Sequence, residues 1–168
     1  QERSHAVESA SAAGVLYCGD QQQLKLIPPT GPAAVVASGS FRSCQATLSP
    51  DGKWIVYTGN QTGRFELYLR RADLMGRARQ LTTDGAFQPH WSQTSPEVFF
   101  LDLRGRLHTR ALNREGVPEV RPRLLFETPV KSGRSTRNDY EPGLDGRFLV
   151  RIAAGGESAR LRVLQLPS

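Results

Sequence analysis

Hydrophobic residues along the chain occur in short runs, separated by glycine, proline and polar residues. The run Trp54–Tyr57 is apolar at every position, as expected for a strand that is packed between two neighbouring sheets. In Phe65–Arg70 apolar and polar residues alternate, which places Phe65, Leu67 and Leu69 on one face of a strand. The pattern therefore predicts short β-strands joined by tight turns, and it excludes a bundle of long helices.

The same pattern recurs through the chain. Ser49–Tyr57 aligns with Ser92–Phe100 at an offset of 43 residues, and Val15–Tyr17 falls in the same frame 40 residues earlier. Asp145–Leu149 repeats Asp51–Ile55. A fixed period of roughly 40 to 50 residues is the signature of a repeat architecture, and about four such units fill the chain.

Each unit is expected to consist of four short strands. The stretch Ser49-Pro50-Asp51-Gly52 predicts a tight turn, because proline presets its own φ and Asp-Gly tolerates the geometry that follows. Residues 6–13 are rich in alanine and also permit a helix, but the repeat frame places a strand and a turn there. We therefore expect a strand and a turn at residues 6–13.

Units of four strands and this length are typical of propeller blades. The sequence thus predicts an all-β fold, a single β-propeller over residues 1–168 built from four-stranded antiparallel blades, with about four blades present. The expected blades span approximately residues 5–43, 44–86, 87–136 and 137–168.

Ser49–Tyr57 and Phe87–Ser92 resemble the TolB-type, WD-like β-propeller repeat. Residues 124–150 are similar to the closing region of large bacterial proteins in which such a propeller follows a serine/threonine kinase or a winged-helix regulator. Since TolB-type propellers usually close with six or seven blades, the resemblance implies part of a larger ring, with a small four-bladed ring as the alternative. It also implies protein contacts at the ring face or mouth, and a periplasmic or extracytoplasmic location.

The composition fits a globular chain with a substantial core. It has 168 residues, of which 38% are hydrophobic and 23% charged, and it contains no apolar run of 18 residues that would predict a membrane-spanning helix. The two cysteines, Cys18 and Cys44, cannot form a zinc site alone. They are expected to form a disulfide or to be two buried apolar residues.

Arginine dominates the basic residues. The formal net charge is +6, and Lys25, Lys53 and Lys131 are the only lysines among 22 basic residues. This bias is explained either by the codon usage of a GC-rich genome or by recognition of phosphate or carboxylate groups. We do not expect a nucleic-acid partner, because the aromatic residues fall at core positions of the predicted strands rather than among exposed basic residues.

No catalytic motif is present. The sequence lacks Gly-x-Ser-x-Gly, a phosphate-binding glycine-rich loop and His-Glu-x-x-His, so we expect no catalytic residues, no cofactor and no metal. The candidate contacts with a ligand or partner are His90 and Trp91, in a strand that would line the central channel, and Arg64 and Arg137, in connecting loops.

The sequence favours a non-catalytic binding or scaffolding propeller that contacts a protein or senses a ligand. One alternative is the propeller of a prolyl-oligopeptidase-like serine peptidase whose catalytic domain is absent from this chain. Another is a propeller that binds a small ligand or sugar in the channel near His90 and Trp91.

Overall fold

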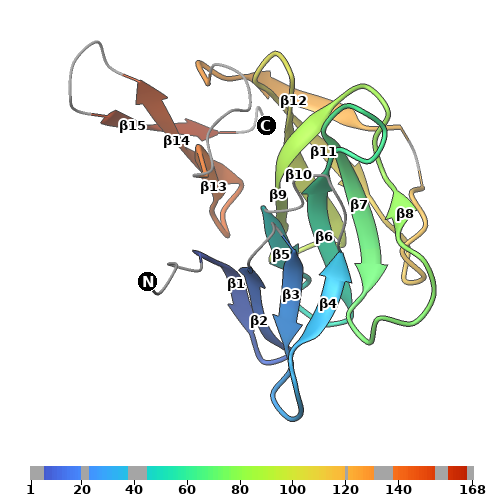
Figure 1. Ribbon diagram of the computed structural model, residues 1–168. Coiled ribbons are helices and arrows are strands. Elements are labelled where there is room, and N and C mark those ends of the chain that lie inside the picture. Colours follow the sequence, from blue (N-terminus) through green and yellow to red (C-terminus); the bar gives the residue numbers. More distant parts are fainter. Residues whose placement is uncertain are drawn as a thin grey trace.

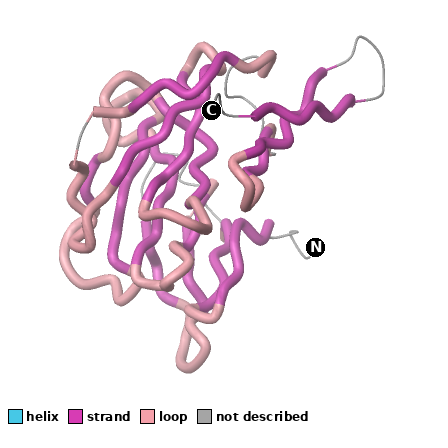
Figure 2. The backbone as a smooth tube through the Cα atoms, turned by 180° about the vertical axis from the view of Figure 1, so that it is seen from behind, coloured by secondary structure: helices cyan, strands magenta, loops and turns pink. Residues whose placement is uncertain are grey.

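The computed structural model describes residues 6–19, 23–37, 45–119, 121–130, 138–153 and 159–165. These residues form fifteen strands and no helix. The strands make four antiparallel sheets that follow one another as the blades of a propeller (Figures 1 and 2). The predicted all-β propeller is confirmed.

The first two sheets each have four strands in sequential order. The first contains β1 (Ala6–Ser11), β2 (Gly14–Cys18), β3 (Leu24–Ile27) and β4 (Ala34–Ala37). The second contains β5 (Ala46–Leu48), β6 (Trp54–Gly59), β7 (Glu66–Arg71) and β8 (Arg79–Gln80). The alanine-rich start of the chain is a strand, as the repeat predicts, because β1 pairs with β2.

The third sheet also has four strands, and the fourth has three among the described residues. The third contains β9 (Ala86–Trp91), β10 (Glu97–Asp102), β11 (Arg106–Ala111) and β12 (Arg123–Glu127). The fourth contains β13 (Tyr140–Pro142), β14 (Arg147–Ala153) and β15 (Ala159–Gln165). We call β1, β5, β9 and β13 the inner strands, because residues from all four line one common cavity.

Three hydrophobic clusters hold neighbouring sheets together. Adjacent residues of β6 belong to different clusters, since Ile55 packs toward the first sheet and Val56 toward the third. This explains why the strand is apolar on both faces. The first cluster includes Leu16, Leu24, Ile55 and Tyr57, the second Val56, Leu67, Trp91 and Val98, and the third Phe87, Phe99, Phe148 and Val150.

The fourth sheet departs from the sequence alignment by one residue. The alignment matches Phe148 with Trp54, but the strand pairing matches it with Ile55. Ile55 pairs with Leu48 on the inner strand of its sheet. Phe148 pairs in the same way with Pro142. The turn between β13 and β14 is one residue shorter than its counterpart, and a shift of one residue exchanges the two faces of a strand.

The two end sheets expose apolar side chains on the faces that are turned away from their neighbours. In the interior sheets such faces are buried against the next sheet. Among the residues that the structure describes, no hydrophobic cluster joins the first sheet to the fourth. The exposed side chains are Val7 (66%), Ile27 (43%) and Val35 (42%) on the first sheet, and Leu149 (41%), Leu161 (66%) and Val163 (57%) on the fourth.

Polar side chains link each inner strand to the next, and we call this set of contacts the inner-strand relay. The hydroxyl oxygen of Ser9 in β1 accepts the backbone N–H of Leu48 in β5 at 3.3 Å. The Oε1 of Gln45 accepts the backbone N–H of Gln88 at 3.0 Å. The Oε1 of Gln88 then accepts the backbone N–H of Asp139 at 2.8 Å. The relay runs from the first sheet to the fourth.

Gln88 is the most constrained member of the relay. Its side chain is fully buried, and its Nε2 also donates to the Oδ2 of Asp139 at 2.8 Å. Its own carbonyl accepts the hydroxyl of Tyr140 at 2.8 Å. Gln45 and Gln88 both have positive φ, 71° and 53°, a conformation that is uncommon for non-glycine residues and persists where surrounding contacts impose it.

Replacing Gln88 by alanine should destabilise the fold by about 2–4 kcal/mol, because it removes the donor to the Oδ2 of the buried Asp139 and the acceptor of the Asp139 backbone N–H, while Arg151 still contacts Oδ1. Urea unfolding followed by tryptophan fluorescence measures this change. Gln93→Ala removes the same side chain from an exposed position and should change the free energy of unfolding by less than about 0.5 kcal/mol. Equal effects of the two substitutions would contradict a structural role for the relay.

Candidate functional site

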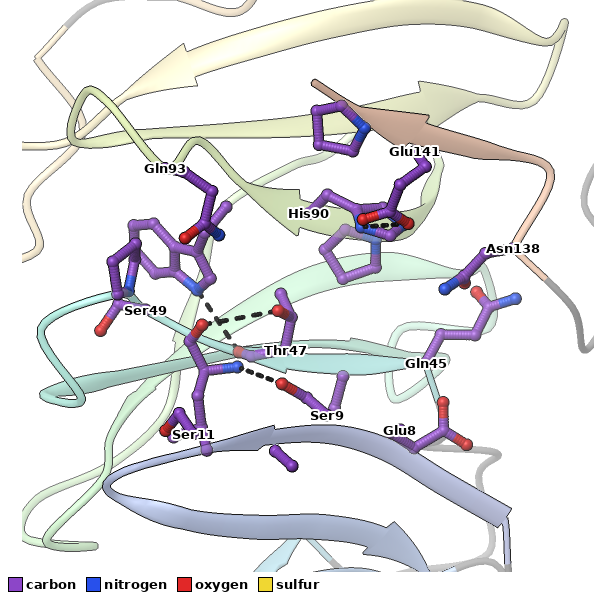
Figure 3. A pocket seen from close by; sticks show the side chains of 17 residues that line it. Glu8, Ser9, Ser11, Gln45, Thr47, Ser49, His90, Gln93, Asn138 and Glu141 are labelled. Carbon is purple, nitrogen blue, oxygen red and sulfur yellow. Dashed lines mark hydrogen bonds and ion pairs between the residues drawn. The ribbon is translucent and has the colours of Figure 1, made fainter. Parts of the chain in front are cut away.

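The inner strands enclose a cavity of about 380 Å³, which we call the axial cavity (Figure 3). It is lined by residues from β1, β5, β9 and β13 and from the segments that adjoin them, so all four sheets contribute. Its walls are mostly polar. The polar side chains labelled in Figure 3 are Glu8, Ser9, Ser11, Gln45, Thr47, Ser49, His90, Gln93, Asn138 and Glu141.

His90 lies in the wall of the axial cavity, as the sequence led us to expect of a channel-lining strand. Its side chain is 12% exposed. Its ring packs edge-on against the ring of Tyr140, with 4.7 Å between the ring centroids. The Nδ1 atom lies 3.8 Å from a carboxylate oxygen of Glu141, beyond hydrogen-bonding distance. Nε2 is buried and has no hydrogen-bond partner among the described residues. Burial lowers the pKa of His90 to about 4, so the ring is neutral at pH 7.

Two carboxylates give the axial cavity a negative charge. Burial raises the pKa of Glu8, although its backbone hydrogen bonds from Gln45 and Ala46 act in the opposite direction. Burial also raises the pKa of Glu141, whose side chain is nonetheless 66% exposed. No arginine or lysine lines the cavity among the described residues. The cavity is thus anionic in a chain whose net charge is +6.

Trp91 borders the axial cavity but belongs mainly to the core. It is 5% exposed and packs in the second hydrophobic cluster. Its indole N–H donates to the carbonyl oxygen of Thr47 at 3.3 Å. The side chain therefore fixes the inner strands of the second and third sheets against each other, and its edge forms part of the cavity wall.

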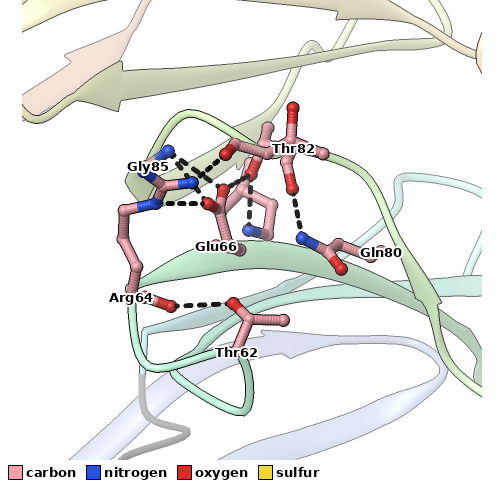
Figure 4. Close-up of polar contacts among 8 residues, drawn as sticks. Thr62, Arg64, Glu66, Gln80, Thr82 and Gly85 are labelled. Atoms are coloured by element: carbon pink, nitrogen blue, oxygen red, sulfur yellow. Dashed lines mark hydrogen bonds and ion pairs between the residues drawn. The ribbon is translucent and has the colours of Figure 1, made fainter.

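Arg64 lies outside the axial cavity, in a polar cluster around the fully buried Glu66 (Figure 4). Its Nε donates to Glu66 at 3.0 Å, and its guanidinium also donates to the carbonyl of Thr83. The other carboxylate oxygen of Glu66 accepts the hydroxyl of Thr82 at 2.6 Å, and the Gly85 N–H donates to both oxygens. Arg64 thus compensates a buried charge. Arg137, the fourth candidate, lies outside the described residues.

The geometry of His90 does not match that of a general base beside a nucleophile. Such a base is hydrogen-bonded to a hydroxyl or thiol and is oriented by a third group. His90 has neither contact in the part of the chain that the structure describes. That part likewise contains no group of three or more His, Cys, Asp and Glu side chains that is suited to a metal ion.

Sequence reasoning missed the two carboxylates of the cavity. Glu8 and Glu141 are 133 positions apart and belong to no motif, so nothing local marks them. The available signal was the offset of 43 residues, which also matches Gln45 with Gln88 and so marks two inner-strand segments that line the cavity.

Two further observations concern the redox state of the cysteines and the presence of membrane-spanning helices. Cys18 is disulfide-bonded, which is one of the two states expected, and Cys44 lies outside the described residues. The described part contains no helix with the length and apolar character needed to traverse a bilayer.

No protein-family model matches the sequence, and no curated protein matches it significantly. Several solved structures are similar to the chain. A protein from Agrobacterium tumefaciens assigned as TolB has a TM-score of 0.59 and 20% identity, covering 74% of this chain and 50% of its own. TolB from Acinetobacter baumannii has a TM-score of 0.68 and 15% identity, covering 98% of this chain and 41% of its own.

An oligogalacturonate lyase in complex with manganese is also similar, with a TM-score of 0.63, 15% identity and coverage of 98% of this chain and 48% of its own. The chain spans half or less of the length of each of these structures. At these identities the similarity defines the fold. The chain has the TolB-like β-propeller fold, and both a TolB and an enzyme share that fold.

Replacing His90 by phenylalanine should make the free energy of unfolding fall less steeply as the pH is lowered from 7 to 4. Because the pKa falls from 6.5 to about 4 on folding, the unfolded state binds more protons between these values. The His90 contribution to stability is therefore present above pH 6.5 and is lost as the pH falls, by about 3 kcal/mol at pH 4. Urea unfolding from pH 7 to pH 4 gives the difference between wild type and variant, and identical pH profiles would contradict the assignment.

Arg64→Ala should lower the free energy of unfolding by about 1 kcal/mol, a modest effect because the Arg64 side chain is 52% exposed while its partner Glu66 is buried. The exposed Arg77 has no partner among the described residues, so Arg77→Ala serves as the control and should have an effect within about 0.5 kcal/mol of zero. Thermal unfolding of the two variants under one buffer condition makes the comparison.

Proposed function

We propose that the chain is a non-catalytic binding module that receives a segment of a protein partner in the axial cavity. The observation that carries this proposal is the composition of the cavity: two carboxylates, a neutral buried histidine with an unpartnered nitrogen, and no basic side chain among the described residues. Such a site favours a segment that brings hydrogen-bond donors, above all the side chain of lysine or arginine.

Electrostatics supports a cationic segment. Burial makes ionisation of Glu8 and Glu141 less favourable than in water, and a bound ammonium or guanidinium group would restore their charged forms. The polar hydroxyl and amide groups along the inner strands would accept or donate to the peptide backbone. The resemblance to TolB-type propellers, which implies protein contacts at the ring mouth, agrees with this position.

The disulfide at Cys18 supports an extracytoplasmic location, since disulfides persist in oxidising compartments and are rare where thiols are kept reduced. We therefore include a periplasmic or extracytoplasmic setting in the proposal.

The test is selection of displayed random twelve-residue peptides on the wild-type chain, followed by fluorescence anisotropy with the enriched peptides. These should be rich in lysine or arginine, and E8Q/E141Q should weaken their binding at least tenfold, since the substitutions remove both charges. The double variant E115Q/E119Q removes two exposed carboxylates that do not line the cavity and should change affinity less than twofold.

Enrichment of peptides that bind both variants equally would overturn the axial cavity as the binding site. Selection of no peptide, together with saturable binding of neutral oligosaccharides, would favour the small-ligand alternative, which the volume of the cavity allows. Covalent labelling of a serine by a fluorophosphonate probe would instead favour a peptidase.

A further inference from the structure

A second cavity lies between the outer parts of the second and third sheets, and we call it the arginine groove. It has a volume of about 550 Å³, within the range of small-molecule sites. One wall is the segment Thr82–Gly85, which follows β8, and the other is one face of β10 and β11. Phe100 also lines it, so the groove sits directly over the second hydrophobic cluster.

Four arginines contribute to the lining of this groove. They come from the turn after β10, from two alternate positions of β11, and from the segment that precedes β12, so three separate parts of the chain converge there. Alternate positions of a strand point to the same face, which explains why both arginines of β11 reach one groove. The four residues are Arg104, Arg106, Arg110 and Arg121.

The carboxylate of Asp102 does not neutralise this cluster. Burial opposes its ionisation, but the backbone N–H groups of Arg106 and Arg104 and the guanidinium of Arg106 outweigh burial and lower its pKa. Its Oδ2 is 2.7 Å from the Nε of Arg106 and 3.1 Å from the Nε2 of His108. These contacts orient Arg106 and His108 in the groove and satisfy the carboxylate. Asp84 is the other carboxylate that lines the groove, so four arginines and two aspartates give the lining a net charge of +2.

Arg104 and Arg121 are exposed, and neither guanidinium has a hydrogen bond or ion pair within the described structure. Arg110 is partly buried. Its Nη1 donates to the carbonyl of Leu81 at 2.5 Å, while its Nε has no hydrogen-bond partner in the described part of the chain. Burial lowers the pKa of Arg110, which means that its positive charge is poorly solvated. A bound anion would supply the missing compensation.

We propose that the arginine groove binds a compact, multiply charged anion that carries phosphate or carboxylate groups. The guanidinium plane matches both groups through paired N–H donors. The exposed guanidinium groups of Arg104 and Arg121 bind the anion, and the partly buried Arg110 contributes further positive charge. The site is separate from the axial cavity, shares no lining residue with it, and has the opposite charge.

The experiment is isothermal titration calorimetry of the full chain with inorganic pyrophosphate and, separately, with citrate, at constant ionic strength maintained with sodium chloride. Binding should be saturable with one site per chain. The double variant R104Q/R121Q should weaken it at least tenfold. R77Q/R114Q removes the same charge from exposed positions outside the groove and should change affinity less than twofold.

Saturable binding of pyrophosphate alone would support the proposal and assign phosphate, binding of citrate alone would assign carboxylate, and binding of both would support the shared chemistry. Absence of saturable binding for both anions would overturn the proposal. So would equal weakening by the two double variants, which would reflect the overall charge of the chain, or full retention of affinity by R104Q/R121Q. Since all four substituted arginines are exposed, each variant should keep the wild-type circular dichroism spectrum.

Discussion

The inner-strand relay is the constraint on which the rest of the molecule depends. A sheet that packs through apolar side chains alone can slide over its neighbour, because hydrophobic contacts have no direction. Hydrogen bonds from Gln45 to the backbone of Gln88, and from Gln88 to the backbone of Asp139, fix the height and angle of each sheet at the axis. The positive φ of both glutamines indicates that the surrounding structure holds them in this arrangement. These contacts therefore determine the geometry of the walls of the axial cavity.

The sequence predicted the blades well because their signals are local and repeated. The apolar run Trp54–Tyr57 predicted a strand buried on both faces, and Ile55 and Val56 indeed serve different clusters. The predicted turn at Ser49–Gly52 is closed by a hydrogen bond from the Gly52 N–H to the Ser49 carbonyl, and Gly52 has φ of 69°. In the fourth sheet the repeat alignment differs from the strand pairing by one residue, since the length of a single turn decides which face Phe148 occupies.

The site was harder to predict than the fold, because its members meet only in three dimensions. His90 was placed in the channel wall from its position in the repeat, but the acidity of that wall comes from Glu8 and Glu141, at opposite ends of the chain. The excess of arginine was visible in the composition, whereas its concentration at one groove between the second and third sheets was not. The chain is basic overall, and the structure shows that it has an acidic axial cavity and a basic arginine groove.

The relay also has a consequence for how such a chain can diverge. Each link joins a side chain of one sheet to a backbone N–H of the next, and every residue except proline carries that donor. A link therefore does not depend on the side chain of the residue that supplies the N–H, and the relay requires only one polar side chain in each sheet to reach the next. A scaffold that is fixed in this way tolerates extensive substitution, in keeping with identities of 15–20% to structures of the same fold.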